Sequence, residues 1–254
     1  MGRAADRAEY MAGFHRDRPG AVAAVLGRSR AGDHNPYHWL SRAVSAQART
    51  VVDVASGSGA VARQLALPGR TVVSVDLAAG QVQMAAEAGP AVQGDALRLP
   101  VADGIADVVT SSMGLAVISP AEAVLREMAR VLRPGGLMIV MGPSLRPMSP
   151  ADARELALLF AAMRARVRFP GALERLGLST VLPLVGVRKV EDARERYRFT
   201  VSSREDAEML LRALYLPSAD TEQVAAGVEH LVKRVTARGP VALPIPMRRV
   251  VALK

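Results

Sequence analysis

Cysteine is absent from this chain of 254 residues, and several kinds of chemistry are absent with it. Disulfides, thiolate metal sites, iron–sulfur clusters and cysteine nucleophiles all require a residue that the protein does not have. The first twenty residues are rich in Arg and Asp and contain no apolar core of a secretory signal, so we read no signal peptide. These observations predict a cytoplasmic protein.

Lysine and aromatic residues are scarce as well. Only three basic residues are lysines, the other thirty are arginines, and aromatic residues make up 4% of the chain. The net charge of +9 raises the question of a polyanionic partner. The arginines are spread along the chain rather than gathered in one run, and there are few aromatic rings for stacking on bases. We therefore do not expect nucleic acid as the partner.

Long hydrophobic runs are also missing. The run "LMIVM" at 137–141 is far shorter than the ~20 residues that a membrane span needs, so we expect no membrane insertion. Half of the residues are nevertheless hydrophobic, which is enough for a sizeable core. No cluster of acidic residues or histidines indicates a bound metal ion.

From residue 50 onward, short β-branched runs alternate with segments rich in Ala and Leu, which is typical of an α/β sheet covered by helices on both faces. The expected strands are Thr50–Val54, Thr71–Val75, Ala91–Gln93, Ile105–Thr110 and Leu137–Met141. The expected helices between them are Gly59–Ala66, Gly80–Ala88 and Pro120–Leu132.

The two ends of the chain differ from this middle part. Short helices are expected at 20–29 and 36–48, and longer ones at 150–167, 203–215 and 220–236, with Ser119, Ser149 and Ser203 as candidate N-caps. We interpret the chain as one domain. Its expected parts are a helical cap (1–48), a cofactor-binding core (49–145), a substrate lid (146–240) and a closing strand (241–254).

The stretch "VVDVASGSGAVARQLA", residues 51–66, joins a strand to a glycine turn and a helix. Gly57 and Gly59 allow a sharp turn and a close approach of the backbone to a ligand. Asp76 ends the next strand, nineteen residues after Gly57, where its carboxylate can accept both hydroxyls of a ribose. No Gly-Lys-Ser/Thr follows the turn, so a nucleoside cofactor is favoured over a P-loop nucleotide.

Three further segments continue the pattern: "GDALRLP" (94–100), "ADVVTSSMG" (106–114) and "VLRPGGLMIV" (131–140). Together with the glycine turn and "VVSVD", this series resembles class I S-adenosylmethionine-dependent methyltransferases. It is most similar to the small-molecule group with the quinone-biosynthesis C-methyltransferases and natural-product tailoring enzymes. The resemblance covers residues 50–145 well and the final strand loosely.

The resemblance implies a Rossmann-like sheet of seven strands, mostly parallel, closed by Ala193–Val201 pairing antiparallel with Met247–Leu253. It implies S-adenosyl-L-methionine as cofactor. The residues that match the family's cofactor site are Asp53, Ala55, Ser56, Gly57, Gly59, Asp76, Leu77, Gly94, Asp95, Ala96, Ser111 and Ser112. Most members have glycine where this chain has Ala55, although alanine also occurs in the quinone-methylating branch.

A hydroxyl or acidic-carbon acceptor would need a general base, for which histidine is suited near neutral pH. Three of the four histidines fall within the first 48 residues, beside aromatic side chains. As the general base we favour His38, followed by Tyr10 and His15. Arg194, Arg196 and Arg198 alternate along one expected strand and so share a face. They could bind an acidic substrate there, but in a chain with thirty arginines we expect them to be solvated.

The resulting hypothesis is methyl transfer from S-adenosylmethionine to an O, N or C atom of a small molecule in bacterial metabolism. Two alternatives stay open. One is a cyclase or other non-methylating enzyme on the same fold, and the second is a nucleic-acid methyltransferase. The segment "TSSMGL" lacks the Asn/Asp-Pro-Pro-aromatic sequence of amino-methylating nucleic-acid enzymes, which disfavours the second. A homodimer also stays open.

Overall fold

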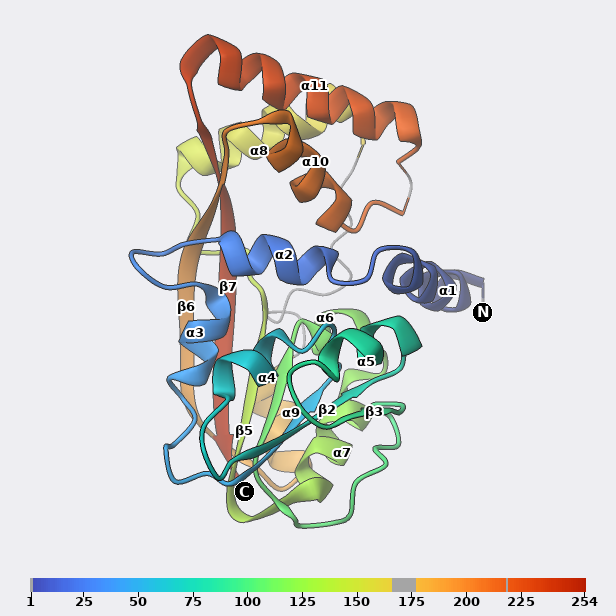
Figure 1. Ribbon diagram of the computed structural model, residues 1–254, viewed down its shortest axis with the longest axis vertical. Coiled ribbons are helices and arrows are strands. Elements are labelled where there is room, and N and C mark those ends of the chain that lie inside the picture. Colours follow the sequence, from blue (N-terminus) through green and yellow to red (C-terminus); the bar gives the residue numbers. More distant parts are fainter. Residues whose placement is uncertain (1, 166–176, 218) are drawn as a thin grey trace.

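Seven strands pair into one sheet in the order β3-β2-β1-β4-β5-β7-β6 (Figure 1). The computed structural model describes residues 2–165, 177–217 and 219–254. The strands are β1 (Thr50–Val54), β2 (Thr71–Asp76), β3 (Ala91–Gln93), β4 (Ala106–Ser112), β5 (Leu132–Pro143), β6 (Arg188–Val201) and β7 (Val241–Leu253). The first five are parallel, and β7 is antiparallel to both of its neighbours, which confirms the predicted Rossmann-like sheet.

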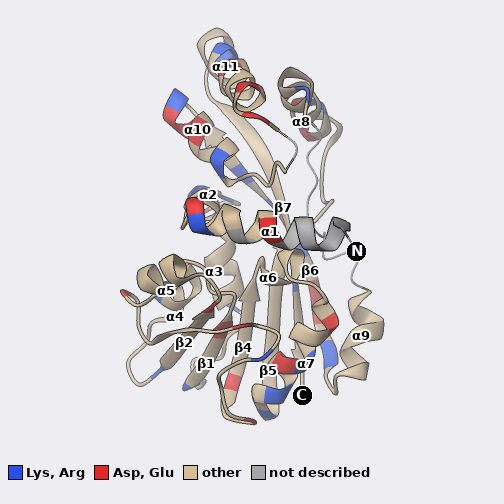
Figure 2. Ribbon diagram, turned by 90° about the vertical axis from the view of Figure 1, so that its right-hand side faces the viewer, with Lys and Arg blue, Asp and Glu red and all other residues tan. Residues whose placement is uncertain are grey.

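Helices cover both faces of this sheet (Figures 1 and 2). On one face lie α3 (Pro36–Ser41), α4 (Ala60–Leu65) and α5 (Ala79–Ala85), and on the other α7 (Ala121–Val131) and α9 (Leu178–Leu184). The short α6 (Gly114–Val117) follows the carboxyl end of β4. The two faces bury separate apolar clusters, one around Leu125 and Met128 of α7 and one around Leu40 and Val61.

The pairing of β6 with β7 extends well beyond the rest of the sheet. It runs from Arg188 opposite Leu253 to Val201 opposite Val241, whereas β5 pairs with β7 only as far as Pro143 opposite Met247. Past that point the two strands continue as a ribbon above the sheet (Figure 1).

The ribbon carries three helices, α8 (Pro150–Met163), α10 (Arg204–Ala213) and α11 (Thr221–Arg238). These helices and the upper ribbon, called here the lid, have an apolar cluster of their own that includes Leu159, Phe199, Leu211 and Leu231. The lid stands above the carboxyl ends of the parallel strands (Figure 2).

Helices α1 (Gly2–Asp17) and α2 (Ala21–Arg28) lie between the lid and the sheet (Figures 1 and 2). Successive residues of α2 pack against the lid and against the sheet. Val25 belongs to the apolar cluster of the lid, and Leu26 belongs to that of the sheet. The guanidinium of Arg28 also binds Asp206 of α10 at 2.6 Å. Helix α2 therefore joins the lid to the sheet.

Three local predictions are wrong. The helix expected at 36–48 ends at Ser41, because the guanidinium of Arg70 binds the carbonyl oxygens of Ser45 and Ala48 and holds that stretch in turns. Ser119 does not cap a helix, since α7 begins after Pro120 without a side-chain cap. The strand expected from Leu137 already begins at Leu132, and its pairing with β4 is interrupted by a register shift around the Pro-Gly-Gly segment.

Other helix starts are confirmed. The hydroxyl of Ser149 accepts a bond from the backbone N–H of Asp152 in a capping box, and Ser203 caps α10 through Asp206 N–H. Helix α8 ends at Met163, and positions 166–167 of the expected helix lie outside the described residues. The short helices α6 and α9 were not predicted.

The three alternating arginines of β6 are partly exposed, as expected, and each also pairs with a carboxylate, which was not predicted. Arg196 Nη1 lies 2.7 Å from Asp152 Oδ2, and Arg198 Nη2 lies 3.1 Å from Asp152 Oδ1. Arg194 pairs with Asp192 at 3.5 Å. The Asp152 side chain is 2% exposed, so one buried carboxylate both caps α8 and fastens it to the ribbon.

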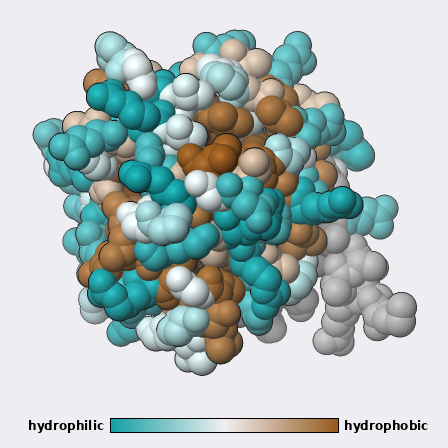
Figure 3. Space-filling view, turned by 90° about the horizontal axis from the view of Figure 1, so that it is seen from below, coloured by the Kyte–Doolittle hydropathy of each residue, from teal (hydrophilic) through white to brown (hydrophobic). Residues whose placement is uncertain are grey.

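None of the helices in the described ranges is both long and apolar enough to span a lipid bilayer. Figure 3 shows the face at the amino ends of the parallel strands, where apolar side chains lie in several groups separated by hydrophilic ones. A ligand site is better sought at the opposite edge, where the lid faces the sheet.

We predict that Asp152→Ala lowers the free energy of unfolding by about 1–2 kcal/mol, because the backbone N–H of Ser149 loses its acceptor in the capping box and two half-exposed arginines lose their partner. Asp152→Asn, which keeps an oxygen for the cap but not the charge, should lose about half as much. Urea unfolding followed by circular dichroism measures both. Equal stability of Asp152→Ala and the unmodified protein would contradict the fastening role.

Candidate functional site

The carboxyl ends of β1 and β4 mark the candidate site. The chain leaves β1 toward β2 on one side of the sheet, while β4 lies on the other side of β1. Such a reversal of strand order leaves a crevice in which open α/β sheets bind ligands. The segments that follow β1, β2, β3 and β4 meet at this edge.

Asp76 joins three of these segments. Its Oδ2 accepts the backbone N–H of Gly57 at 2.8 Å, and its Oδ1 accepts that of Ala78 at 3.0 Å. Its backbone carbonyl accepts the N–H of Gly94 at 2.9 Å. The glycine turn, the end of β2 and the end of β3 are thereby brought together as the sequence predicted, with the Asp76 carboxylate at the centre.

The glycine turn is closely packed. A Cβ at Gly59, whose φ is +79°, would lie 2.9 Å from Cα of Ala85, so only glycine fits there. Ala55 adopts the left-handed region with φ of +54°, which disfavours any residue with a side chain. Its methyl group has room because position 114 is glycine, where a Cβ would lie 2.9 Å from Cβ of Ala55.

Asp53 is fully buried at the end of β1. Burial raises the pKa of this carboxyl to about 7, the bond donated by the Thr110 hydroxyl at 2.7 Å opposes the shift, and the nearby Asp76 adds to it. Oδ2 of Asp53 has no hydrogen-bond partner in the described structure. A bound cation or donor would favour its ionised form.

Further buried polar atoms at this edge lack partners. Among the described residues, the hydroxyls of Ser56, Ser111 and Ser112 and Oε1 of Gln81 make no hydrogen bond. Gln81 is 4% exposed, and its Oε1 lies 3.9 Å from where a Cβ of Gly57 would be. Buried polar groups are normally satisfied, so this set indicates a polar ligand. Gln81 was not predicted as a site residue.

The segments after β2 and β3 form an exposed rim. Leu77 is 63% exposed, and Asp95 is exposed with its Oδ1 accepting the N–H of Leu97 at 2.8 Å. Ala96, by contrast, is buried in the apolar cluster around α7. Leu77 and Asp95 are therefore accessible to a ligand, and Ala96 lies beneath them.

An aromatic cluster closes the site from above. Phe14 of α1 packs on Tyr215 with ring centroids 4.6 Å apart, and Met113, which follows β4, packs against the same cluster. The hydroxyl of Tyr10 accepts the backbone N–H of Leu216 at 2.8 Å, which ties α1 to the segment after α10. Tyr215 was not predicted, because nothing near it in the sequence indicates a site.

His15 belongs to this cluster, and its Nε2 lies 3.4 Å from the Tyr215 hydroxyl. Burial lowers the pKa of His15, while the charge of Asp76 opposes the shift. His38 is placed elsewhere. Its ring lies 6.2 Å from that of His34, which in turn contacts Glu195 of β6 at 3.2 Å. The structure thus brings His15, but not His38, near the Asp76 carboxylate.

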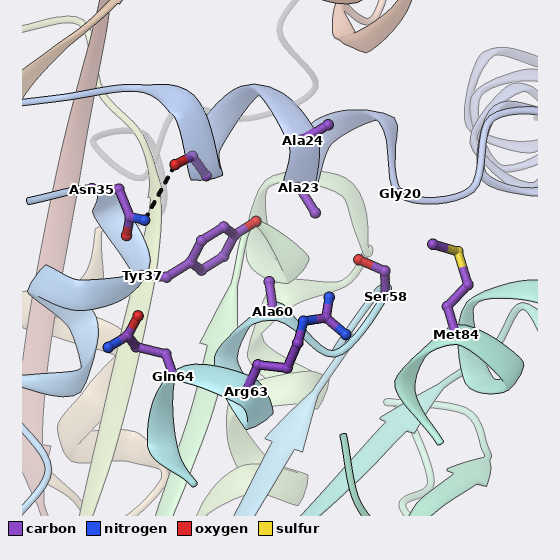
Figure 4. Close-up of a pocket in the computed structure, with 11 residues that line it drawn as sticks. Gly20, Ala23, Ala24, Asn35, Tyr37, Ser58, Ala60, Arg63, Gln64 and Met84 are labelled. Atoms are coloured by element: carbon purple, nitrogen blue, oxygen red, sulfur yellow. Dashed lines mark hydrogen bonds between the residues drawn. The ribbon is translucent and has the colours of Figure 1, made fainter. Parts of the chain in front are cut away.

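A cavity of about 450 Å³ adjoins the glycine turn on the side of α2 (Figure 4). Ser58 and Met84 form its wall toward the turn, and Tyr37 faces it from α3. In the described part of the chain, no group of three or more His, Asp or Glu side chains is arranged to hold a metal ion.

Comparison with known sequences finds methyltransferases that are similar to part of this chain. Residues 52–140 match the family model described as a methyltransferase domain. The demethylmenaquinone methyltransferase of Beutenbergia cavernae is 46% identical over 106 residues, which make up 41% of this chain and 44% of that protein. That of Mycolicibacterium vanbaalenii is 46% identical over 91 residues, 35% of this chain and 40% of that protein. The matched region thus spans less than half the length of these relatives.

Solved structures agree on the fold. A candidate methyltransferase from Bacillus halodurans C-125 superposes with a TM-score of 0.59 at 20% identity, covering 86% of this chain and 98% of that one. The [4+2]-cyclase SpnF superposes with a TM-score of 0.59 at 16% identity, covering 96% and 93%. At such low identity the likeness establishes a Rossmann-like fold and leaves the reaction to be argued from the residues.

The raised pKa of Asp53 gives a prediction for stability. Between the unfolded value of about 3.9 and the folded value of about 7, the folded state binds the additional proton, so this group lowers stability as pH rises through that range. Asp53→Asn keeps an oxygen for the Thr110 hydroxyl and removes the titration. Urea unfolding at about pH 5 and about pH 8 should show a smaller loss of stability for the variant. If the variant and the unmodified protein lose the same stability between the two pH values, the raised pKa of Asp53 is contradicted.

Proposed function

We propose that the chain is a class I methyltransferase, which transfers the methyl group of S-adenosylmethionine to a small-molecule acceptor of quinone type. The observation that carries the proposal is the convergence on Asp76. One carboxylate meets the glycine turn after β1 and the end of β3, and unpartnered buried polar atoms surround the crevice. When bound, the cofactor supplies a methyl group activated by a sulfonium.

The residues at the edge fit such a cofactor. Asp76 can exchange its bonds to Gly57 and Ala78 for the two hydroxyls of a ribose. Leu77 is exposed beside it and can cover the adenine, with Asp95 and the backbone of Ala96 at the edge of the base.

The remaining cofactor residues surround the reactive part of the crevice. In the proposal, the glycine turn faces the methionine portion, which carries a cationic ammonium that would favour ionised Asp53. The turn residues are Ala55, Ser56, Gly57 and Gly59. Ser111 and Ser112 supply free hydroxyls at the end of β4, next to the space for methyl transfer.

The acceptor would lie between this edge and the aromatic cluster of Tyr10, Phe14 and Tyr215. Aromatic rings favour a flat, unsaturated acceptor through stacking and edge contacts. The curated relatives carry the name demethylmenaquinone methyltransferase, which describes a quinone acceptor. The protein's part in the reaction is to align the acceptor and to exclude water.

His15 is the proposed proton acceptor. Its lowered pKa keeps the imidazole neutral near neutral pH, so that it can take a proton from an acceptor hydroxyl or an acidic carbon. The Tyr215 hydroxyl beside it, whose pKa burial raises, stays protonated and can orient the ring. Tyr10 has a positioning role, since its hydroxyl is engaged with Leu216.

We expect the protein to bind S-adenosylmethionine and S-adenosylhomocysteine in calorimetric titrations. Asp76→Ala should weaken both by about 100-fold, because two hydrogen bonds to a charged group are lost. The affinity of Asp76→Asn should lie between those of the unmodified protein and Asp76→Ala. Asp103→Asn changes an exposed carboxylate that pairs with Arg130, and it should bind both compounds as the unmodified protein does. Absence of binding, or indifference to Asp76→Ala in a folded variant, would refute the proposal.

Methyl transfer itself is tested with S-adenosylmethionine labelled in the methyl group. Label should enter reduced demethylmenaquinone or a related hydroxylated aromatic compound, and should not enter bulk RNA. Label in RNA would favour the nucleic-acid alternative. Conversion of an acceptor to an isomer of equal mass, with no label gained, would favour a cyclase on the same fold.

The role of His15 predicts a change in pH dependence. Transfer by the unmodified protein should rise as pH increases through the lowered pKa of His15, and His15→Gln should lose that rise and about 100-fold in rate. His38→Gln is the matched control, and it should keep both the transfer rate and its rise with pH. Binding of S-adenosylhomocysteine should be unchanged in each. An intact pH profile in His15→Gln would exclude it as the base.

A further inference from the structure

The cavity between α2 and α4 has walls of two kinds (Figure 4). Small residues form its upper wall, namely Gly20, which precedes α2, and Ala23, Ala24 and Gly27 of α2. Met84 and the ring of Tyr37 add apolar surface, while the polar side chains that reach it include Arg63 and Ser58. A stem of small cross-section fits against the upper wall, and a polar group fits the opposite side.

Tyr37 presents an unused hydroxyl to this cavity. The residue is 8% exposed, and its hydroxyl makes no hydrogen bond to any described residue and points into the cavity (Figure 4). Burial raises the pKa of Tyr37, Asp53 and Tyr215 add to the shift, and Arg63 opposes it. The hydroxyl therefore stays protonated and is available as a donor to a ligand.

Arg63 of α4 is an exposed arginine that lines this cavity. Several other arginines pair with carboxylates, as Arg28 of α2 does with Asp206 and Arg196 of β6 with Asp152. Arg63 forms no ion pair or hydrogen bond within the described structure, and its guanidinium is directed into the cavity (Figure 4). The cavity thus combines an uncompensated positive charge with a buried donor.

We propose that this cavity is a second ligand site, distinct from the crevice at Asp76, for a molecule with an oxyanion on a slim apolar stem. The oxyanion, a carboxylate or a phosphate, is bound by the Arg63 guanidinium and the Tyr37 hydroxyl. The stem lies along Ala23 and Gly27 of α2. Because Ser58 belongs both to this wall and to the glycine turn, the ligand contacts the cofactor loop from behind.

Gly27 offers a way to block the site without breaking the fold. A Cβ at this helical position meets no atom within 4 Å, so a larger side chain has room to extend. Gly27→Leu should therefore fill the cavity, and it should not destabilise α2, since leucine is a better helix former than glycine. Ala225→Leu, at an exposed position of α11, is the matched control for added volume.

The test uses hexanoate, hexyl phosphate and hexanol as probes against the 15N-labelled full chain. Both anions should shift the backbone amide signals of Ala23, Ala24 and Gly27, and hexanol should bind at least tenfold more weakly. Arg63→Gln should weaken binding of the anions about tenfold and Tyr37→Phe about fivefold. Arg126→Gln, which removes one positive charge from α7, should have no effect. Which anion binds more tightly identifies the head group.

Three results would overturn the inference: no shifts in α2 with either anion, equal binding of hexanol, or unimpaired binding by Gly27→Leu. S-adenosylhomocysteine is titrated separately into the same preparations. If it binds while the anions do not, only the second site fails. If the anions bind and S-adenosylhomocysteine does not, the proposed function fails and the second site stands.

Discussion

The antiparallel pairing of β6 with β7 is the interaction on which the rest of this molecule depends. Its lower half closes the sheet against β5, and its upper half carries α8, α10 and α11. Since one ribbon serves both parts, the lid is held over the carboxyl ends of the parallel strands by backbone hydrogen bonds rather than by a flexible linker. Asp152 and α2 add side-chain contacts to this support.

The crevice below the lid illustrates how a few polar groups organise a site in an apolar setting. Asp76 holds the glycine turn and the segment after β2 through two backbone N–H groups. By contrast, Oδ2 of Asp53 and the hydroxyls of Ser111 and Ser112 are buried without a hydrogen-bond partner among the described residues. A rigid frame with unsatisfied polar atoms is the arrangement expected of a pre-organised ligand site.

Much of this could be predicted from the sequence, for reasons that are local. Valine-rich strands can be recognised from as few as five residues. The nineteen residues from Gly57 to Asp76 correspond to one turn, one helix and one strand. Helices as short as α6 show no period. Tyr215 could not be foreseen, because 200 residues separate it from His15. On α3, one step of about 100° separates His38 from Tyr37, and only the fold decides which faces a cavity.

The pair of Ala55 and Gly114 has a consequence for the substitutions that this edge of the sheet tolerates. Alanine at 55 occupies a left-handed conformation and uses space that only glycine at 114 leaves open. The two positions lie on different strand ends, yet neither can change without regard to the other. A side chain at position 114 would meet the Ser111 hydroxyl at 2.5 Å as well as the Ala55 methyl group at 2.9 Å, so a larger residue there requires changes at both positions. The ends of β1 and β4 are thus coupled through the packing of three small residues, Ala55, Ser111 and Gly114.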